Sequence, residues 1–423
     1  MLKFKVVTLG CKVNSYEAQS VHQSLIDEGY TESLEAADIY VVFTCAVTNV
    51  AESKTRKKIN QLSRENPDAI LCVVGCYVQM NPQQLAQQDH IHILIGSNHK
   101  SQIVEAIHQY QQTKQKIYYV DDQLVKPKYE TMNIQHFNHQ TRAYLKIQDG
   151  CNQFCSYCII PYARGAERSL KLEEVLMNAN KLVETGHKEI VLAGIHTGRY
   201  KDENNHHLDD LVHQLIKIDG LQRIRFSSIE ITEISDVLID LMKNNPKIAR
   251  HLHIPLQSGC DEILAKMNRP YTINEFKKRV NYIREMIPDI SISTDLIVGF
   301  PNETDDSFEK TVQTLNDVAF SFIHVFPYAK KTGTVAYDML NHVDEQIKKQ
   351  RGKICGELSK NSYASYQASM IGKTVNVLIE KSGTTSFGHT SEYVPIYINR
   401  FLAANQLIEI KVIGVDEKGL RGE

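Results

Sequence analysis

Short apolar runs alternate with amphipathic segments through the first 115 residues of the chain. Each run has the length of a buried strand, and each intervening segment has the 3.6-residue periodicity of a helix covering one side of a sheet. We expect strands at 3–9, 39–44, 70–75 and 91–95 and helices at 15–29, 49–65, 82–88 and 99–111. Strands that alternate with helices in this way predict a doubly wound parallel α/β sheet.

The alternation resumes at Arg142 and continues through six further strand–helix units. The predicted strands lie near 143–149, 189–194, 223–229, 251–256, 291–298 and 321–327. Six units are too few for a closed eight-stranded barrel, so we predict an open (βα)6 partial TIM barrel. A long helix from about Asp344 to Met370 follows the last strand.

The pattern changes once more after Gly372, where short alternating strands are separated by Gly, Ser and Asn. Three such runs, at 374–379, 393–398 and 407–412, predict a small antiparallel β-barrel of the oligonucleotide-binding kind. The whole chain therefore divides into an N-terminal domain, a linker rich in Lys and Gln, a barrel with its trailing helix, and a C-terminal barrel. The predicted boundaries are 1–120, 121–142, 143–371 and 372–423.

Composition limits the class of protein and the compartment. Hydrophobic residues make up 42% of the 423 residues and charged residues 23%, and no run of about 20 apolar residues that could span a membrane occurs. The first strand starts at once without a signal peptide, and nine cysteines in such a chain indicate metal or redox use in a reducing compartment, which predicts the cytoplasm. A net charge of −2 gives no overall nucleic-acid signature, so RNA would bind through local patches.

Three cysteines, Cys151, Cys155 and Cys158, form a CxxxCxxC motif directly after the first barrel strand. A structural zinc site would normally pair one CxxC with a second pair elsewhere, and the sequence has none. Three thiolates instead suit a [4Fe–4S] cluster whose fourth iron has no protein ligand. The motif also lies at the carboxyl end of a barrel strand, where barrel enzymes place their chemistry.

Three more cysteines, Cys11, Cys45 and Cys76, each follow a predicted strand of the N-terminal sheet. Parallel strands point their carboxyl ends to one edge, so we expect these thiols to converge there. Gly10 and Gly75 would let the backbone approach a bulky cluster. A lone buried cysteine is most often a small apolar residue, but the repeated placement favours a second three-cysteine cluster.

The remaining candidates have weaker signals. Cys72, Cys260 and Cys355 are expected to be inert buried thiols, and His251 and His253 to serve packing or hydrogen bonding. The basic stretch Lys54–Lys58, with Arg64 beyond it, is either a solvated helix face or a phosphate-binding face. Polar residues near the active face are candidate contacts for a cofactor, and they are Gln257, Ser258 and Asp295.

The motifs together resemble the methylthiotransferase family of the radical S-adenosylmethionine superfamily, over the whole chain. The resemblance rests on CxxxCxxC followed by Ile160–Gly165, on the three N-terminal cysteines, on Gly10–Glu17, on His251–Gly259 and on His324–Tyr328. It is strongest to the branch that modifies threonylcarbamoyladenosine in tRNA, since other branches have Gln-Met-Asn or Pro-Lys-Asn where this chain has Lys12–Asn14. The C-terminal barrel would then be a TRAM domain that binds RNA.

This resemblance implies two [4Fe–4S] clusters and S-adenosylmethionine as cofactors. The cluster on Cys151, Cys155 and Cys158 would generate a 5′-deoxyadenosyl radical, and that on Cys11, Cys45 and Cys76 would present the methylthio group. The target would be C2 of the adenine at position 37, beside the tRNA anticodon, with a low-potential electron donor and a sulfur donor as further partners. We predict S-adenosylmethionine contacts for Gln257, Ser258 and Asp295, and no catalytic residue beyond the cluster ligands.

Two positions depart from the family pattern. Asn302 stands where glycine is usual, and Asn tolerates the left-handed backbone that glycine commonly serves. Lys331 replaces a frequent arginine, which keeps the charge but loses the planar guanidinium. The alternatives to the predicted activity are the same chemistry on isopentenyladenosine tRNA or on a ribosomal protein, and an iron–sulfur RNA-binding protein without turnover.

Overall fold

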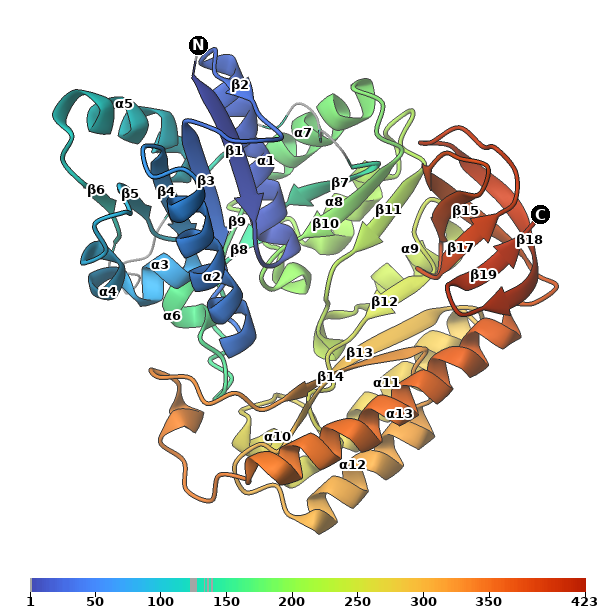
Figure 1. Ribbon diagram of the computed structural model, residues 1–423. Coiled ribbons are helices and arrows are strands. Elements are labelled where there is room, and N and C mark those ends of the chain that lie inside the picture. The colour runs from blue at the N-terminus through green and yellow to red at the C-terminus, as the bar shows by residue number, and fades with distance from the viewer. Residues whose placement is uncertain (1, 122–127, 133, 135–136, 138–139) are drawn as a thin grey trace.

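The N-terminal region forms one parallel six-stranded sheet (Figure 1). In this computed structural model residues 2–121, 128–132, 134, 137 and 140–423 are described. The strands are β1 (Lys3–Thr8), β2 (Thr31–Glu32), β3 (Ile39–Thr44), β4 (Ile70–Gly75), β5 (Ile93–Ile95) and β6 (Ile117–Tyr119), in the order β2-β1-β3-β4-β5-β6. The helices are α1 (Lys12–Asp27), α2 (Asn49–Glu65), α3 (Cys76–Met80), α4 (Pro82–Ala86) and α5 (Ile103–Thr113), with a 3-10 turn at Lys100–Gln102.

Helices cover both faces of this sheet. Val41 and Phe43 of β3 pack with α1 and α5, whereas Tyr40 and Val42 pack with the helices α2, α3 and α4 on the opposite face. Because alternate residues of a strand point to opposite faces, a strand buried on both faces reads as a continuous apolar run. The predicted doubly wound sheet is therefore confirmed, and the two short outer strands, β2 and β6, are additions that the apolar pattern did not predict.

The central region is the predicted open barrel. Its strands are β7 (Arg142–Lys146), β10 (Glu189–Ala193), β11 (Arg223–Phe226), β12 (His251–His253), β13 (Ser291–Val298) and β14 (Phe322–Pro327). They form two parallel three-stranded sheets joined by single bridges, Ile224 to Ile248 and Ser228 to His253. In the described chain β7 and β14 do not pair with each other, so the barrel stays open.

The barrel helices lie outside the strands and bury amphipathic faces against them. They are α7 (Leu172–Glu184), α8 (Leu208–Leu215), α9 (Asp236–Asn244), α10 (Asp261–Lys266), α11 (Ile273–Met286) and α12 (Asp305–Val318). The long α13 (Glu345–Ser369) packs on β14, as the sequence predicted. A short antiparallel strand pair, β8 (Gln148–Asp149) with β9 (Arg168–Ser169), and the one-turn α6 (Ile160–Arg164) flank the cysteine loop.

The C-terminal strands close into a small barrel. They are β15 (Thr374–Lys381), β16 (Ser386–Thr390), β17 (Pro395–Ile398), β18 (Leu407–Asp416) and β19 (Gly419–Gly422), in the order β15-β16-β17-β19-β18. The predicted small β-barrel is confirmed; its strand pairs are antiparallel except for β17 and β19, which run parallel to close it. Buried Arg223 and Arg225 of β11 bind Glu189 and donate to carbonyl groups of this barrel, Asn376 O and Ser391 O among them.

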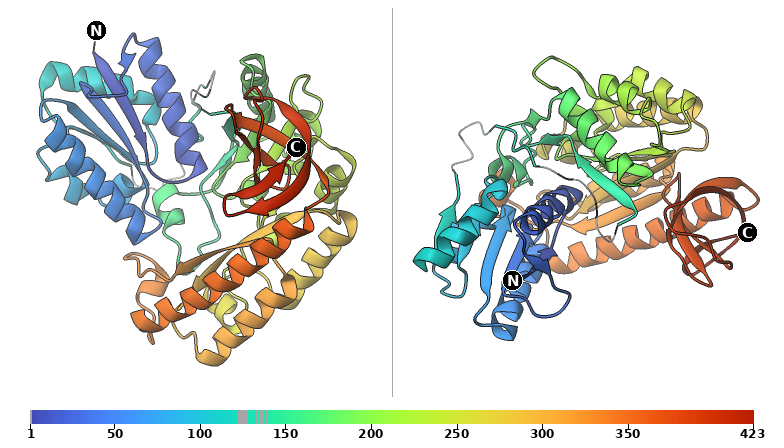
Figure 2. Two further views of the ribbon diagram at one scale, coloured as in Figure 1. Left: turned by 45° about the vertical axis from the view of Figure 1, so that its right-hand side comes forward. Right: turned by 90° about the horizontal axis from the view of Figure 1, so that it is seen from above.

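The N-terminal domain and the C-terminal barrel lie on different sides of the central barrel (Figure 2). The predicted linker, 121–142, has no helix or strand in its described residues before β7, but it is not a solvated spacer. Met132, Ile134 and Phe137 are buried in the core shared by α1 and β7. Residues 122–127, 133, 135–136 and 138–139 of that segment lie outside the described residues. Of the described helices, none combines the length and apolarity that a membrane span requires.

Candidate functional site

The three N-terminal cysteines meet at one edge of the sheet. Cys11, Cys45 and Cys76 directly follow the loop or strand ends of β1, β3 and β4, which are neighbours in the sheet. Thr44 pairs with Gly75, so Cys45 and Cys76 leave adjacent strands at the same level. A Cβ on Gly10, the neighbour of Cys11, would lie 3.1 Å from Cys45 Cβ, so the β1 and β3 ends are close together. Burial raises the pKa of the Cys45 thiol to about 12. The predicted convergence is therefore observed.

Two glycines give the backbone room beside these cysteines. Gly75 has φ +108°, and a Cβ there would lie 3.0 Å from the carbonyl oxygen of Thr44. Gly150, just before Cys151, has φ +74°, and a Cβ would lie 2.1 Å from the carbonyl oxygen of Ala166. Only glycine fits such close approaches at positive φ. Neighbouring backbone thus requires glycine at positions 75 and 150, and the predicted room for a cluster beside Gly10 and Gly75 stays a prediction.

Asn14 ties the cysteine-bearing loops together. Its buried side-chain amide donates at 2.9 Å to the carbonyl oxygens of Leu9 and of Thr44, which come before Cys11 and Cys45 respectively. The Thr44 carbonyl is buried and that of Leu9 partly buried, so this asparagine bridges the ends of β1 and β3 at the cysteine edge.

The CxxxCxxC loop is held by hydrogen-bond donors to sulfur. The backbone N–H of Gln153 donates to Cys151 Sγ at 3.4 Å, and Arg269 Nη1 donates to Cys155 Sγ at 3.4 Å. Donors to sulfur favour the thiolate, which is the metal-binding form. Burial raises the pKa of Cys155, and the guanidinium of Arg269 opposes that rise. Arg269 was not predicted, because nothing in the sequence marks a distant loop residue as a partner of this motif.

A second set of donor atoms shares Cys151. Its sulfur lies 3.4 Å from His196 Nδ1, and ligand atoms of Cys151, His196 and Glu167 all lie within 4.8 Å of one another. A single metal ion on this set would use one cysteine of the loop and leave Cys155 and Cys158 without a role. His196 also has another partner, since its Nε2 lies 2.7 Å from Glu233. The three thiols with their sulfur-directed donors are the better fit to an iron–sulfur cluster.

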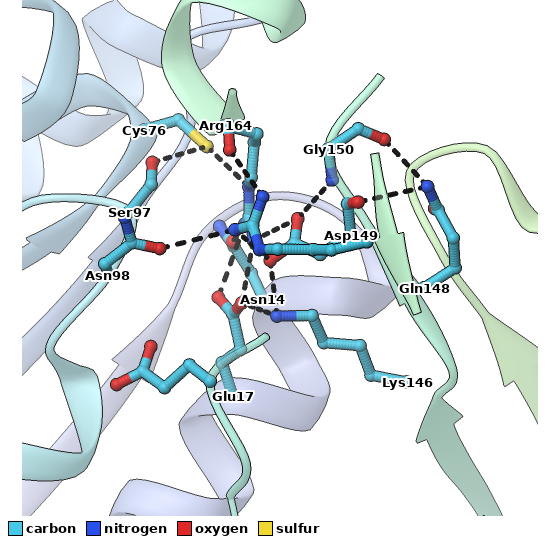
Figure 3. Close-up of polar contacts among 12 residues, drawn as sticks. Asn14, Glu17, Cys76, Ser97, Asn98, Lys146, Gln148, Asp149, Gly150 and Arg164 are labelled. Carbon is cyan, nitrogen blue, oxygen red and sulfur yellow. Dashed lines mark hydrogen bonds and ion pairs between the residues drawn. The ribbon is translucent and has the colours of Figure 1, made fainter. Parts of the chain in front are cut away.

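Arg164 joins the two cysteine groups (Figure 3). Its Nε donates to Cys76 Sγ at 3.2 Å, its Nη1 lies 2.7 Å from Glu17 Oε1 and 3.4 Å from Asp149, and its Nη2 donates to Asn14 Oδ1 at 3.0 Å. Cys76 belongs to the first cysteine group, and Asp149 is two residues before Cys151 of the second. One fully buried guanidinium therefore fixes both groups relative to each other.

Further buried charges complete this network. Lys146 of β7 lies 2.7 Å from Glu17 and 2.6 Å from Asp149, and Lys100 lies 3.4 Å from Glu17. Burial alone would raise the pKa of Glu17, but Arg164, Lys100 and Lys146 lower it to about 2. Glu17 is therefore ionised at neutral pH. The network spans α1, the turn before α5, β7 and α6, so it clamps the N-terminal domain onto the barrel.

Lys331, one of the two residues that depart from the family pattern, makes a second contact between the N-terminal domain and the barrel. Lys331 follows β14 and is almost buried, and its Nζ lies 2.5 Å from Glu52 of α2. The lysine therefore makes an ion pair between the N-terminal domain and the barrel, and a planar guanidinium is not needed for it.

The other residues singled out in the sequence are also located. Asn302 has φ +66°, as its tolerance of the left-handed region predicted. Arg56 of the basic stretch is exposed and donates to the hydroxyl of Tyr77 at 3.3 Å.

A cavity of about 560 Å³ opens between the inner face of the barrel, α13, the C-terminal barrel and the N-terminal domain. The strands contribute alternate residues, as expected for one face. The charged and titratable residues that line it are Lys12, His251, His253, Asp295, His324, His389 and Glu392. Aromatic side chains of Phe322, Phe326, Tyr363 and Tyr393 form much of the remaining wall. A volume of this size suits a nucleoside or a small cofactor.

The predicted cofactor contacts are distributed unequally around this cavity. Asp295 lines it and lies 3.2 Å from His253 Nε2. Gln257 has φ +66° and pairs through its backbone with β13, and buried Ser258 accepts a hydrogen bond from the N–H of Cys260.

The two histidines of β12 share one hydrogen-bond partner. His253 Nδ1 lies 2.9 Å from Ser293 Oγ, and His251 Nε2 lies 3.0 Å from the same oxygen. The hydrogen-bonding role expected for both histidines is confirmed.

Among the described residues, the other three cysteines form no disulfide. Cys72, Cys260 and Cys355 are at most 2% exposed, and they pack in apolar clusters. Burial raises the pKa of Cys355 to about 12, so its thiol is neutral. Their predicted role as inert thiols agrees with this packing.

Comparison with known proteins decides the family. The model of the radical SAM superfamily matches residues 145–315, and that of an uncharacterized protein family, UPF0004, matches residues 3–96. The threonylcarbamoyladenosine tRNA methylthiotransferase MtaB of Bacillus subtilis is 38% identical over 399 residues, which cover 92% of this chain and 88% of the relative. The chain is a radical S-adenosylmethionine methylthiotransferase.

Other methylthiotransferases extend the comparison. MtaB of Aquifex aeolicus is 34% identical over 97% of this chain and all of its own length, and the tRNA-2-methylthio-N(6)-dimethylallyladenosine synthase of Thermodesulfovibrio yellowstonii is 31% identical over 99% and 97%. Membership of the radical SAM superfamily implies S-adenosylmethionine and a [4Fe–4S] cluster as cofactors. The CxxxCxxC thiols of this methylthiotransferase fit such a cluster in number and in hydrogen bonding.

Solved structures of similar fold are distant in sequence. The radical S-adenosylmethionine methyltransferase TsrM of Kitasatospora setae superposes with a TM-score of 0.59 at 12% identity, covering 79% of this chain and 74% of its own. The cobalamin-dependent radical enzyme OxsB superposes with a TM-score of 0.52 at 14% identity over 83% and 56%. These similarities confirm the barrel fold of the methylthiotransferase.

Proposed function

We propose that this enzyme attaches a methylthio group to C2 of N6-threonylcarbamoyladenosine at position 37 of tRNA. The observation that carries the proposal is the buried Arg164, which touches Cys76 of one cysteine group and Asp149 beside the other. A reaction that both generates a radical and delivers sulfur needs two centres held at a fixed separation. The MtaB relatives, which match this chain along its length, bear names that specify this substrate and this reaction.

Two clusters are proposed at these groups. Cys151, Cys155 and Cys158 would hold the radical S-adenosylmethionine cluster, and Cys11, Cys45 and Cys76 would hold a second [4Fe–4S] cluster. When bound, the first would supply the electron that cleaves S-adenosylmethionine, and the second would hold the sulfur, obtained from a separate donor, for transfer. The protein positions the ligands, and Arg269 and Arg164 donate hydrogen bonds to the sulfurs.

The net change on the substrate is replacement of the C2 hydrogen by a methylthio group. One S-adenosylmethionine provides the methyl, and a second takes up the C2 hydrogen as 5′-deoxyadenosine. Forming the new C–S bond also requires a sulfur donor and a low-potential electron donor. Gln257, Ser258 and Asp295 remain the proposed S-adenosylmethionine contacts. Asp295 alone has its side chain at the cavity, so it is the first to test.

The nucleoside would enter the central cavity from the anticodon loop. Unpaired loop bases can be splayed out of their stack and bound between aromatic and apolar side chains, and Phe322 and Phe326 line this cavity. We propose the domain boundaries 1–120, 121–142, 143–371 and 372–423, with the last domain a TRAM module that binds the tRNA. Because its substrate is tRNA, we place the enzyme in the cytoplasm.

Two single substitutions test the division of labour. Cys155→Ala should abolish 5′-deoxyadenosine formation from S-adenosylmethionine and dithionite, since it removes a ligand of the cluster that drives cleavage. Cys45→Ala should preserve 5′-deoxyadenosine formation and stop methylthiolation. If both variants lost S-adenosylmethionine cleavage to the same extent, the assignment of the two cysteine groups to separate roles would be wrong.

A further inference from the structure

Lys12 is a cation without a counter-charge in the central cavity. It follows Cys11 directly, opens α1, and is half-buried where it lines the cavity. Within the described chain, its ammonium makes no hydrogen bond and has no carboxylate within 4.0 Å. A lysine that is partly removed from water without a partner is destabilised unless a ligand supplies the negative charge.

The surroundings of Lys12 add positive charge. Arg225 and Arg142 both act on its ammonium, but each is already engaged, Arg225 with Glu189 at 2.7 Å and Arg142 with Glu380 at 3.4 Å. Lys12 is thus the cation left available at this end of the cavity.

The carboxylates that line the cavity serve other groups. Asp295 lies 3.2 Å from His253 Nε2, and Glu392 acts on Arg250 and Arg223. Neither is among the groups that act on Lys12. Among the described residues, no carboxylate therefore neutralises the positive end of the cavity.

A fixed aromatic wall borders that end. The ring of Tyr393 lies under both guanidinium groups, 5.1 Å from Arg142 and 4.9 Å from Arg225, and stacks on His389 at 5.1 Å. Tyr393 has φ +69°, which a non-glycine residue adopts only when its surroundings hold it there. The positive end is therefore preorganised by residues of the barrel and of the C-terminal domain.

The substrate classes of tRNA methylthiotransferases differ in charge at one place. The N6 substituent of threonylcarbamoyladenosine ends in the carboxylate of threonine, whereas that of dimethylallyladenosine is a hydrocarbon. We infer that Lys12 binds the threonine carboxylate and is a specificity-determining residue for this substrate. The inference rests on the proposed function. A charge-assisted hydrogen bond in a half-buried site is expected to give about 10- to 100-fold discrimination between an anionic and a neutral substituent.

The test compares two RNA hairpins that differ by one charge. Both carry the anticodon stem-loop sequence; one has threonylcarbamoyladenosine at position 37 and the other has its threonine methyl ester. Dissociation constants are measured by fluorescence anisotropy on the reconstituted full-length enzyme at low ionic strength, where charge pairs are least screened. The ratio of the two constants is taken within one preparation, so any misfolded fraction cancels.

The wild-type enzyme should prefer the acid over the ester by about 10- to 100-fold. Lys12→Met should bring this ratio close to one, Lys12→Arg should keep most of it, and Lys12→Glu should make the ester the better ligand. Lys3→Met, an exposed lysine at the start of β1, is the matched control and should leave the ratio unchanged.

Two outcomes would overturn the inference. One is a wild-type enzyme that methylthiolates the acid hairpin but binds both hairpins equally, and the other is a Lys12→Met enzyme that keeps the wild-type ratio. Failure of the wild-type enzyme to methylthiolate the acid hairpin would instead refute the proposed function. The two failures are therefore distinguishable.

Discussion

Replacing Glu17 by glutamine should loosen the attachment of the N-terminal domain to the barrel. Glu17 is fully buried and lies at 2.7 Å from Arg164 and from Lys146, and at 3.4 Å from Lys100. Glutamine has the same shape but no charge, so three buried cations lose their shared anion. Lys146 and Arg164 keep Asp149, at 2.6 and 3.4 Å, which limits the loss.

The magnitude follows from the pKa of Glu17. Its neighbours lower that pKa from 4.5 to about 2, and each pH unit corresponds to about 1.4 kcal/mol. The free energy of unfolding of the N-terminal domain should therefore fall by about 3 kcal/mol, the lower end of the usual cost of breaking a buried ion pair. At an m-value of about 1–3 kcal/mol per molar urea, the midpoint should drop by about 1–3 M.

The sign of the pH dependence is fixed by the lowered pKa. The contribution of Glu17 is complete above the unfolded-state pKa of 4.5 and is lost as the pH falls towards about 2. The difference between wild type and Glu17→Gln should be constant from pH 7 to pH 5 and shrink to less than half by about pH 3.

The chain contains no tryptophan, so the transition is best followed by far-UV circular dichroism. Asp27→Asn, an exposed position on the same helix, is the control and should change the free energy of unfolding by less than about 0.5 kcal/mol. A Glu17→Gln protein as stable as the control at pH 7, or a difference that grows as the pH falls, would refute the reasoning.

Three further predictions use other parts of the structure. Gly75→Ala should lower the melting temperature and the iron content, because its Cβ meets the Thr44 carbonyl oxygen at 3.0 Å, and unchanged values of both would contradict this. Asn302→Ala should cost about 1 kcal/mol in urea unfolding and Asn302→Gly less, since φ is +66°; the opposite order would be evidence against this explanation. Arg225→Met should speed trypsin cleavage between α13 and β15, because it removes the bonds to Glu189 and to the Ser391 carbonyl, and an unchanged cleavage rate would show that the C-terminal barrel docks by other contacts.

The sequence predicted the architecture because its apolar runs are long and regular. The strand at 39–44 and the helix at 49–65 coincide with β3 and α2, since uninterrupted apolar and amphipathic periods fix their ends. Short edge strands such as Thr31–Glu32 have too few residues to show a period, and Gly419–Gly422 pairs parallel to β17 only through barrel closure. Local patterns carry no information about such pairings.

The site was predictable to the extent that its chemistry is local in sequence. The cysteine groups follow strands, so parallel-sheet geometry brings them together without further information. The links between them come from positions far apart in the chain, such as Arg164 with Glu17 and Arg269 with Cys155. In the sequence, Lys12 was notable only because other branches of the family have a different residue after the first cysteine. The cavity that Lys12 lines became visible only with the fold.

The central claim is tested most directly by the nucleosides of tRNA from cells that lack this enzyme. Mass spectrometry should find threonylcarbamoyladenosine without its 2-methylthio derivative in the deletion strain, with the derivative restored by the wild-type gene and not by Cys45→Ala. Unchanged 2-methylthio-threonylcarbamoyladenosine in the deletion strain, or loss of the methylthio group from isopentenyladenosine instead, would contradict the account.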